Sequence, residues 1–273
     1  MPPRFTFHGE EKITGTLPAN PTAFDFFRLY FDDDIIDLIV AETNRYADQY
    51  ISRNEIAPHS AVKTWQPTDR DEMKTFLGLA TLMGIVFKHR LSMYWSTDSV
   101  YKTDIFGSCM ARDRFLLLLK FLHFSDNDLF DAKDPNRDRL FKIRPLVNLI
   151  RDRCANVYSP GRDLCVDESL VLFKGRLAFK QFIRTKRARF GIKLFELCTS
   201  NGIILDFLVY HGKMNEELLP QFQISESIPV TVMQRYLNKG HRLFVDNYYT
   251  TPALALHLLD NNMKLMGTVR ANR

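Results

Sequence analysis

The sequence is poor in cysteine and has no long apolar run. Its four cysteines are far apart, form no Cys-x-x-Cys pair and have no histidine at ligand spacing, so we expect buried, reduced thiols rather than a structural zinc site. No stretch approaches the ~18 uncharged apolar residues of a membrane span, and the first residues lack a signal-peptide core. Twelve Gly and twelve Pro among 273 residues exclude a collagen-like or low-complexity chain. We therefore expect a soluble globular protein without a membrane segment.

Positive charge is concentrated in the second half of the chain. Residues 161–273 hold 16 Lys and Arg against 10 Asp and Glu, and residues 174–193, the basic run, hold eight basic residues and no acidic one. Phenylalanines are interspersed through this run, so it is not a disordered tail. One interpretation is a solvated hairpin arm; the other is a surface for DNA phosphates, because clustered cations release counterions from nucleic acid. The candidate DNA contacts are Lys174, Arg176, Arg184, Lys186, Arg187, Arg189 and Lys193.

The spacing of apolar residues divides the chain into three parts. Residues 1–20 lack periodicity and predict a flexible lead-in. Residues 21–160 carry apolar stripes at helical spacing. These stripes lie at residues 35–50, 73–83, 115–122 and 145–157. Residues 161–273 predict three strands, a helix, a strand, a helix and a strand. We expect Pro229 to begin the first helix of this part and Gly240 to end it. The predicted fold class is α + α/β, a helical N-terminal domain followed by a mixed-sheet domain.

Two carboxylates directly follow apolar strand residues. Asp167 comes after Leu-Cys-Val and Asp246 after Leu-Phe-Val. Each could cap a strand end or pair with an arginine, because a charge in an apolar strand is costly unless it is compensated. Together they indicate a metal site, since carboxylates on adjacent strands can hold Mg²⁺ with water and phosphate oxygens as the other ligands.

Several blocks of residues resemble the piggyBac transposase family. The blocks are 165–169 (CVDES), 173–176 (FKGR) and 189–193 (RFGIK) for the first catalytic block, 245–251 (VDNYYTT) for the second, 267–273 for the following strand, and 21–46 for the start of the helical dimerisation and DNA-binding domain. They occur in the family's order and together cover roughly residues 20–273.

The resemblance implies a helical dimerisation and DNA-binding-like domain over residues 21–160 and an RNase H-like catalytic domain over 161–273, truncated before the third acidic residue. By motif position Asp167 is the first catalytic, metal-ligating carboxylate and Asp246 the second, with Mg²⁺ or Mn²⁺ as the cofactor. The family's third Asp lies farther downstream, and Asp260 does not replace it because it ends the helix before the last strand. We therefore expect weak metal binding and no DNA excision or joining by a polypeptide of these 273 residues.

The resemblance also implies function and partners. The family carries out cut-and-paste DNA transposition at TTAA sites, which implies transposon-end DNA as the partner, a homodimer and a nuclear location. One hypothesis is a transposase, or its N-terminal portion, with a metal-dependent strand-transfer site. Another is a domesticated, catalytically inactive derivative that keeps DNA contact or dimerisation, and a third is a degenerate product or gene-model fragment. Genomic sequence beyond the codon for Arg273 would distinguish them.

Overall fold

The computed structural model describes residues 5–184, 189–212 and 218–269. The chain forms two compact units: a sheet unit, Met1–Tyr30 with Ile150–Arg273, and a helical unit, Phe31–Leu149. The second boundary between these units falls within helix α6 (Arg144–Val157).

The helical unit contains the helices α2 (Asp33–Arg53), α3 (Arg70–Leu82), α4 (Asp104–Cys109) and α5 (Arg112–Phe121). A 3₁₀ helix lies between α2 and α3 (Ala61–Thr64), another between α3 and α4 (Leu91–Trp95), and a third after α5 (Asn127–Leu129). Asp32 and Asp69 cap α2 and α3 by accepting backbone N–H groups from the first turn. Apolar faces of α2, α3 and α5 meet in a buried core that includes Ile39, Phe76 and Phe115. The four stripes predicted from the sequence are confirmed as α2, α3, α5 and α6.

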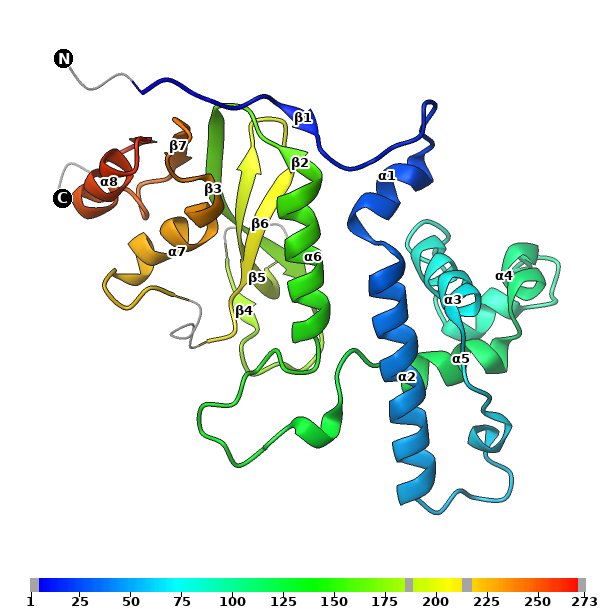
Figure 1. The fold of residues 1–273 in the computed structure, drawn as a ribbon. Helices are drawn as coiled ribbons and strands as arrows, with labels where there is room; N and C mark the ends of the chain where they lie inside the picture. The colour runs from blue at the N-terminus through cyan, green and yellow to red at the C-terminus, as the bar shows by residue number, and fades with distance from the viewer. Residues whose placement is uncertain (1–4, 185–188, 213–217, 270–273) are drawn as a thin grey trace. The chain divides into compact units, whose positions relative to one another are not determined.

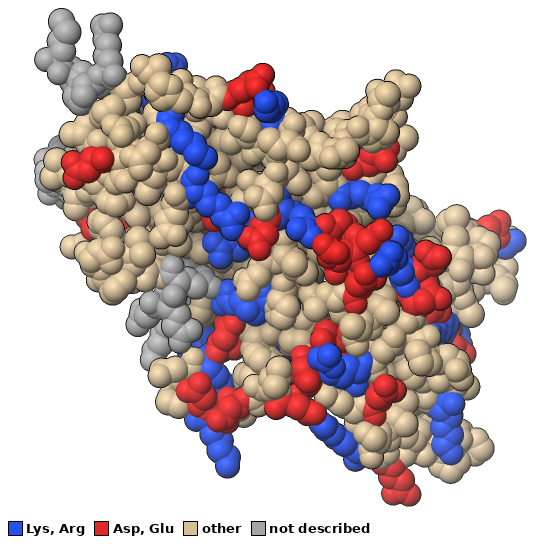
Figure 2. Space-filling view, in the orientation of Figure 1, with Lys and Arg blue, Asp and Glu red and all other residues tan. Residues whose placement is uncertain are grey.

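Charged side chains on the helical unit are interspersed rather than segregated by sign. Figure 2 shows acidic and basic side chains next to each other over this unit. Arg70 pairs with Asp37 at 2.5 Å, and Lys74 pairs with Asp33 at 2.8 Å. Exposed pairs of this kind contribute ~0–1 kcal/mol each, so their main effect is to neutralise the surface.

A mixed sheet of six strands organises the sheet unit (Figure 1). Its strands are β3 (Asp163–Leu172), β4 (Gln181–Phe182), β5 (Phe190–Thr199), β6 (Ile204–Val209), β7 (Arg242–Val245) and β8 (Lys264–Gly267). The order is β4-β5-β3-β7-β8, with β6 also paired to β5. β5 is antiparallel to β3 and β6, whereas β7 is parallel to β3 and β8 is parallel to β7. The predicted order of elements is confirmed, with the short strand β4 in addition.

Helices α7 (Ile224–Met233) and α8 (Pro252–Asp260) cover one face of this sheet. Their buried side chains join those of β3, β5 and β7 in one apolar core. The expectation that Pro229 begins α7 is wrong: the helix begins five residues earlier and contains Pro229. The reason is a capping box, in which Glu226 accepts the backbone N–H of Gln223 at 3.1 Å and the Gln223 side chain caps the same turn. We refer to this face as the core face.

The segment before residue 31 is attached to the sheet unit. Strand β1 (Lys12–Ile13) pairs with β2 (Tyr158–Ser159), and α1 (Ala23–Tyr30) follows. The His8 N–H also donates to the Lys239 carbonyl at 3.1 Å. Gly240, at φ +80, permits this approach, because a Cβ there would lie 2.2 Å from the Thr6 carbonyl oxygen. His8 and strand β1 thus connect this segment to the rest of the sheet unit through backbone hydrogen bonds.

Two findings concern the other expectations drawn from composition. No helix within the described parts of the chain is long and apolar enough to cross a membrane. Cys154 is buried and Cys165 and Cys198 are half-buried, but Cys109 is exposed. Cys109 is the last residue of the short helix α4, in which Phe106 is the buried residue. The apolar residues near Cys109 in the sequence therefore did not predict its exposure correctly.

Candidate metal and DNA site

Strand β3 places Asp167 on the face of the sheet opposite the core face. Leu164 and Val166 are each only 1% exposed and belong to the apolar core. Side chains alternate between the faces of a strand, and Asp167 is exposed. The three apolar residues before Asp167 thus fix the direction in which its carboxylate points.

Strand β7 places Asp246 in the same way. Leu243 and Val245 are buried in the core, and Asp246 is the exposed residue immediately after the strand. Its carboxylate accepts a hydrogen bond from the backbone N–H of Tyr248 at 2.9 Å, and the Thr250 hydroxyl donates to the backbone carbonyl of Asp246 at 2.8 Å. These bonds close a turn that holds Asp246 at the carboxyl end of β7.

The register between the two strands makes these carboxylates neighbours. β3 and β7 run parallel, and Val166 is aligned with Val245. Asp167 is the next residue of β3, and Asp246 is the first residue after β7. Adjacent strands lie ~4.8 Å apart, so the backbones of these two exposed residues are neighbours at this end of the sheet. We call Asp167 and Asp246 the acidic pair.

A third carboxylate, which the sequence did not reveal, lies on β5, the strand on the other side of β3 from β7. Glu196 on β5 is directly opposite Asp167 in the antiparallel register. It is half-buried and accepts the Ser169 hydroxyl at 2.6 Å. The sequence around Glu196 resembles that of the other strands and does not distinguish this carboxylate. Its position opposite Asp167 depends on the β3–β5 register, which no short motif specifies.

Glu168 and Lys193 lie on the core face. Glu168 accepts the hydroxyl of buried Tyr249 at 3.0 Å, and the Lys193 ammonium lies 3.5 Å from the same carboxylate. Alternation along β3 predicts this position for Glu168, and the bond to Tyr249 confirms it. The structure does not bring Lys193 to the acidic pair, because Lys193 shares its face of β5 with Phe195, over whose ring its ammonium lies at 4.6 Å. Burial, and then the charge of Glu168, raise the pKa of Tyr249, so its hydroxyl stays a donor.

Two thiols share the face of the acidic pair. Cys165 is directly opposite Cys198 in the β3–β5 register. Burial raises the pKa of the Cys198 thiol to about 11, with Glu196 adding to the shift, and burial also raises the pKa of Cys165. Both are therefore protonated at neutral pH, and the ligands that this face offers a cation are oxygen atoms.

The sequence as a whole matches known transposases. Residues 22–273 match the profile of the family described as Transposase IS4. The chain is 29% identical over 272 residues to PiggyBac transposable element-derived protein 3 of Homo sapiens, an alignment that covers 95% of this chain and 43% of that protein. The chain is a piggyBac-type member of the Transposase IS4 family. The resemblance noted in the sequence is thereby confirmed.

Further relatives agree with this assignment. The piggyBac-type chain is 30% identical over 258 residues to PiggyBac transposable element-derived protein 2 of Homo sapiens, covering 90% of this chain and 40% of that protein. A cryo-EM structure of a piggyBac transposase synaptic complex with hairpin DNA superposes with a TM-score of 0.74 at 27% identity, covering 90% of this chain and 50% of that one. The chain thus spans less than half the length of these two curated relatives.

The acidic pair offers a cation two carboxylates rather than a complete cage. Among the residues that the structure describes, no group of three or more His, Cys, Asp or Glu is placed to hold a metal ion. Mg²⁺ is commonly bound by one or two carboxylates, with waters and substrate phosphates completing its octahedron. The acidic pair fits that mode through its residue types and position, and the neighbouring thiols do not compete.

The described residues of the basic run include the two paired arms of a hairpin. β4 pairs with the start of β5, and the Ile183 N–H donates to the Arg189 carbonyl at 2.8 Å. The described candidate cations of the hairpin are exposed, namely Lys174, Arg176, Arg184 and Arg189. Lys186 and Arg187 lie outside the described residues. Exposed cations on a paired segment are compatible with both interpretations of the basic run, a solvated arm and a surface for DNA phosphates.

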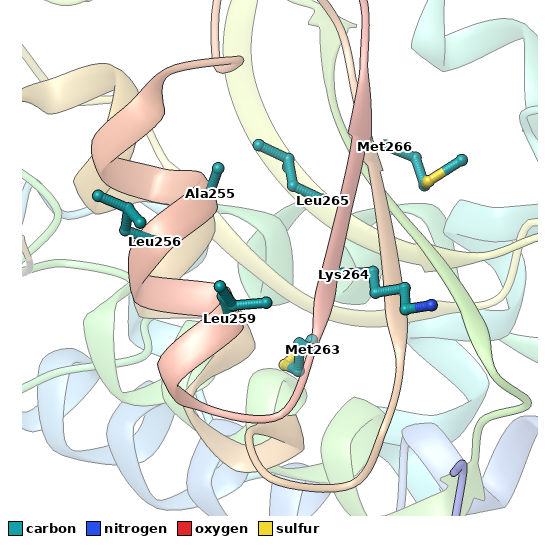
Figure 3. A pocket seen from close by; sticks show the side chains of 7 residues that line it. All are labelled: Ala255, Leu256, Leu259, Met263, Lys264, Leu265 and Met266. Carbon is teal, nitrogen blue, oxygen red and sulfur yellow. The ribbon is translucent and has the colours of Figure 1, made fainter. Parts of the chain in front are cut away.

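A groove elsewhere in the sheet unit has a different character. Seven residues of α8, β8 and the turn between them line a space of about 440 Å³, shown in Figure 3. The side chains of Leu256 and Leu259 lie on α8, whereas Lys264 and Met266 point to the other side of β8. Its lining is apolar apart from Lys264, so it supplies no ligands for a hard cation.

Proposed function

We propose that this chain is a DNA-binding part of a transposase-derived protein, with Asp167 and Asp246 as the catalytic carboxylates of a metal-dependent DNA cleavage and strand-transfer site. The observation that carries the proposal is the register of β3 and β7, in which Val166 is aligned with Val245 and each of these residues is followed by an exposed Asp. Oxygen donors, an adjacent basic hairpin and membership of a transposase family all agree with this role.

Each part of the site has a separate task in this proposal. A bound Mg²⁺ or Mn²⁺ would polarise a phosphoryl oxygen and favour deprotonation of the attacking hydroxyl. Asp167 and Asp246 hold the cation and must be ionised to do so. The exposed cations of the hairpin offset the repulsion between these carboxylates and DNA phosphates, since two carboxylates alone would repel the backbone that they must approach.

We further propose that residues 161–273 form an RNase H-like domain. Support comes from the order of the strands, with three antiparallel strands continued by two parallel ones and two helices on one face, and from the likeness to the piggyBac transposase structure. For residues 21–160 we propose dimerisation and DNA binding. The DNA would resemble transposon ends with TTAA targets, the protein would act as a homodimer, and its location would be the nucleus.

The second candidate is a derivative that binds DNA without catalysis. It is favoured by the finding that the described residues hold no group of three metal-ligating side chains. Both candidates require DNA binding through the basic run, so the first experiment addresses that shared requirement.

The experiment measures the affinity of the chain for duplex DNA over a series of salt concentrations. The triple variant Arg184→Ala, Lys186→Ala, Arg187→Ala is expected to bind all sequences more weakly and to lower the salt slope by roughly 1 per lost phosphate contact. Arg235→Ala with Lys239→Ala is the control, because these exposed cations lie near the end of α7 on the core face. Unchanged affinity and slope in the triple variant would limit the hairpin to solubility or packing.

A further inference from the structure

Two phenylalanines on the hairpin are exposed although they contact each other. Phe182 on β4 is directly opposite Phe190 on β5, and their ring centroids are 4.7 Å apart. Phe182 is 57% exposed and Phe190 49% exposed. Each ring thus contacts the other, while about half of the surface of each side chain stays exposed to solvent. We call Phe182 and Phe190 the aromatic pair.

The aromatic pair and the acidic pair share one face of the sheet. Glu196 is directly opposite Asp167, and Phe190 lies six positions before Glu196 on the same regular strand. An even number of positions returns a strand to the same face. At ~3.3 Å per residue, the rings are about 20 Å from the acidic pair along β5.

The charge around the aromatic pair is of one sign. Residues 174–193 contain no Asp or Glu, and the described cations nearest in sequence, Arg184 and Arg189, are exposed. The Lys180 ammonium lies 5.8 Å from the Phe190 ring centroid. A partner must therefore tolerate, or carry, dense negative charge while offering flat apolar surface to the rings.

Single-stranded DNA combines these two properties. Its backbone is anionic, and each unpaired base has a free π-face that can stack on an aromatic side chain. In a duplex those faces are covered by neighbouring base pairs, which leaves only phosphates and base edges for contact. An acidic protein surface offers the charge but no series of flat rings, so the aromatic pair favours nucleic acid.

We propose that Phe182 and Phe190 form a stacking platform for unpaired bases of a DNA strand whose phosphates contact the exposed Arg184 and Arg189 and which continues along this face of the sheet to the acidic pair. At ~3.4 Å per stacked nucleotide, the platform is about six nucleotides from the carboxylates. The proposal deepens the proposed function, on which it rests, by assigning a single-stranded segment as part of the DNA that this site takes.

The test compares a short single-stranded oligodeoxynucleotide with the duplex of the same sequence. Each carries 2-aminopurine, whose fluorescence reports stacking of that base. In the double variant Phe182→Leu, Phe190→Leu, which keeps apolar bulk but removes the rings, single-strand affinity is expected to fall between about 5-fold and 150-fold for one stacked base. Duplex affinity is expected to change by less than about twofold, because phosphate contacts are retained.

Two further variants guard against a folding artefact. Phe182→Trp with Phe190→Trp keeps the rings and is expected to bind the single strand at least as well as the wild type. Leu172→Ala removes a side chain that is 60% exposed but not aromatic, and is expected to leave both affinities unchanged. Recovery of single-strand binding in the Trp variant would assign the loss in the Leu variant to the rings.

The possible outcomes distinguish failure of the stacking platform from failure of the proposed function. A wild type that binds the duplex but not the single strand, or a Leu variant that weakens both probes equally, overturns the platform and leaves the proposed function standing. Wild-type self-association that is abolished in the Leu variant, with no change in DNA binding, would identify the pair as a protein interface and also overturn it. A wild type that binds neither probe overturns both proposals.

Discussion

Replacing Tyr249 with Phe tests how the sheet unit holds its acidic pair. The Tyr249 ring is fully buried, and its hydroxyl donates to the Glu168 carboxylate at 3.0 Å. Glu168 adjoins Asp167 in β3, and Tyr249 lies in the turn that Asp246 begins, so this bond ties the two carboxylate-bearing segments together from the core face. A hydrogen bond to a charged group contributes ~1.5–3 kcal/mol. We expect Tyr249→Phe to lower the free energy of unfolding of the sheet unit by about that amount.

Urea unfolding followed by hydrogen exchange resolves this effect, because exchange in β3 and β7 reports the sheet unit separately from the helical unit. Tyr248→Phe is the matched control, since that ring is 44% exposed. Its expected change is below ~0.5 kcal/mol. In a double-mutant cycle, Glu168→Gln should reduce the additional effect of Tyr249→Phe. Equal losses in Tyr249→Phe and Tyr248→Phe, or no loss in either, would refute the reasoning.

Two other perturbations test the packing of the chain by unfolding measurements. Gly191→Ala should destabilise by ~1–3 kcal/mol, because a Cβ there would lie 2.2 Å from the Val171 carbonyl oxygen. Gly78 lies in the middle of α3, where an added Cβ would have no atom of the rest of the protein within 4 Å. Gly78→Ala should therefore raise the free energy of unfolding by ~0.5–1 kcal/mol. A change of the same sign in both variants would contradict the structure. Burial lowers the pKa of His241 in the folded state, so the unfolded state binds more protons and stability should fall as pH drops from ~7.5 through the unfolded pKa of ~6.5. The fall should be smaller in His241→Asn, and an identical pH profile would count against a buried neutral imidazole.

The acidic pair could be predicted from sequence because each Asp follows three apolar residues. Such a run predicts a buried strand, and alternation then sets the side of the sheet on which the next residue lies. The parallel alignment of β3 with β7 could not be predicted from these local patterns. The resemblance to piggyBac transposases is what indicated that Asp167 and Asp246 belong to one site.

Other features depended on long-range register and could not be predicted. Glu196 is opposite Asp167 only because of how β3 and β5 align across the basic hairpin. Lys193 was named as a candidate DNA contact, but the same register places it beside Glu168 on the core face. The start of α7 was missed because the capping box at Gln223 outweighed the usual preference of Pro229 for a first turn.

Manganese binding to the intact chain tests the central claim most directly. Calorimetric titration with Mn²⁺ should show binding to the wild type that is lost in Asp167→Asn and equally in Asp246→Asn, because both carboxylates must be ionised to hold one hard cation. Asp260→Asn, an exposed carboxylate at the end of α8, should bind as the wild type does. Binding that survives in both single Asn variants would contradict the acidic pair as a metal site.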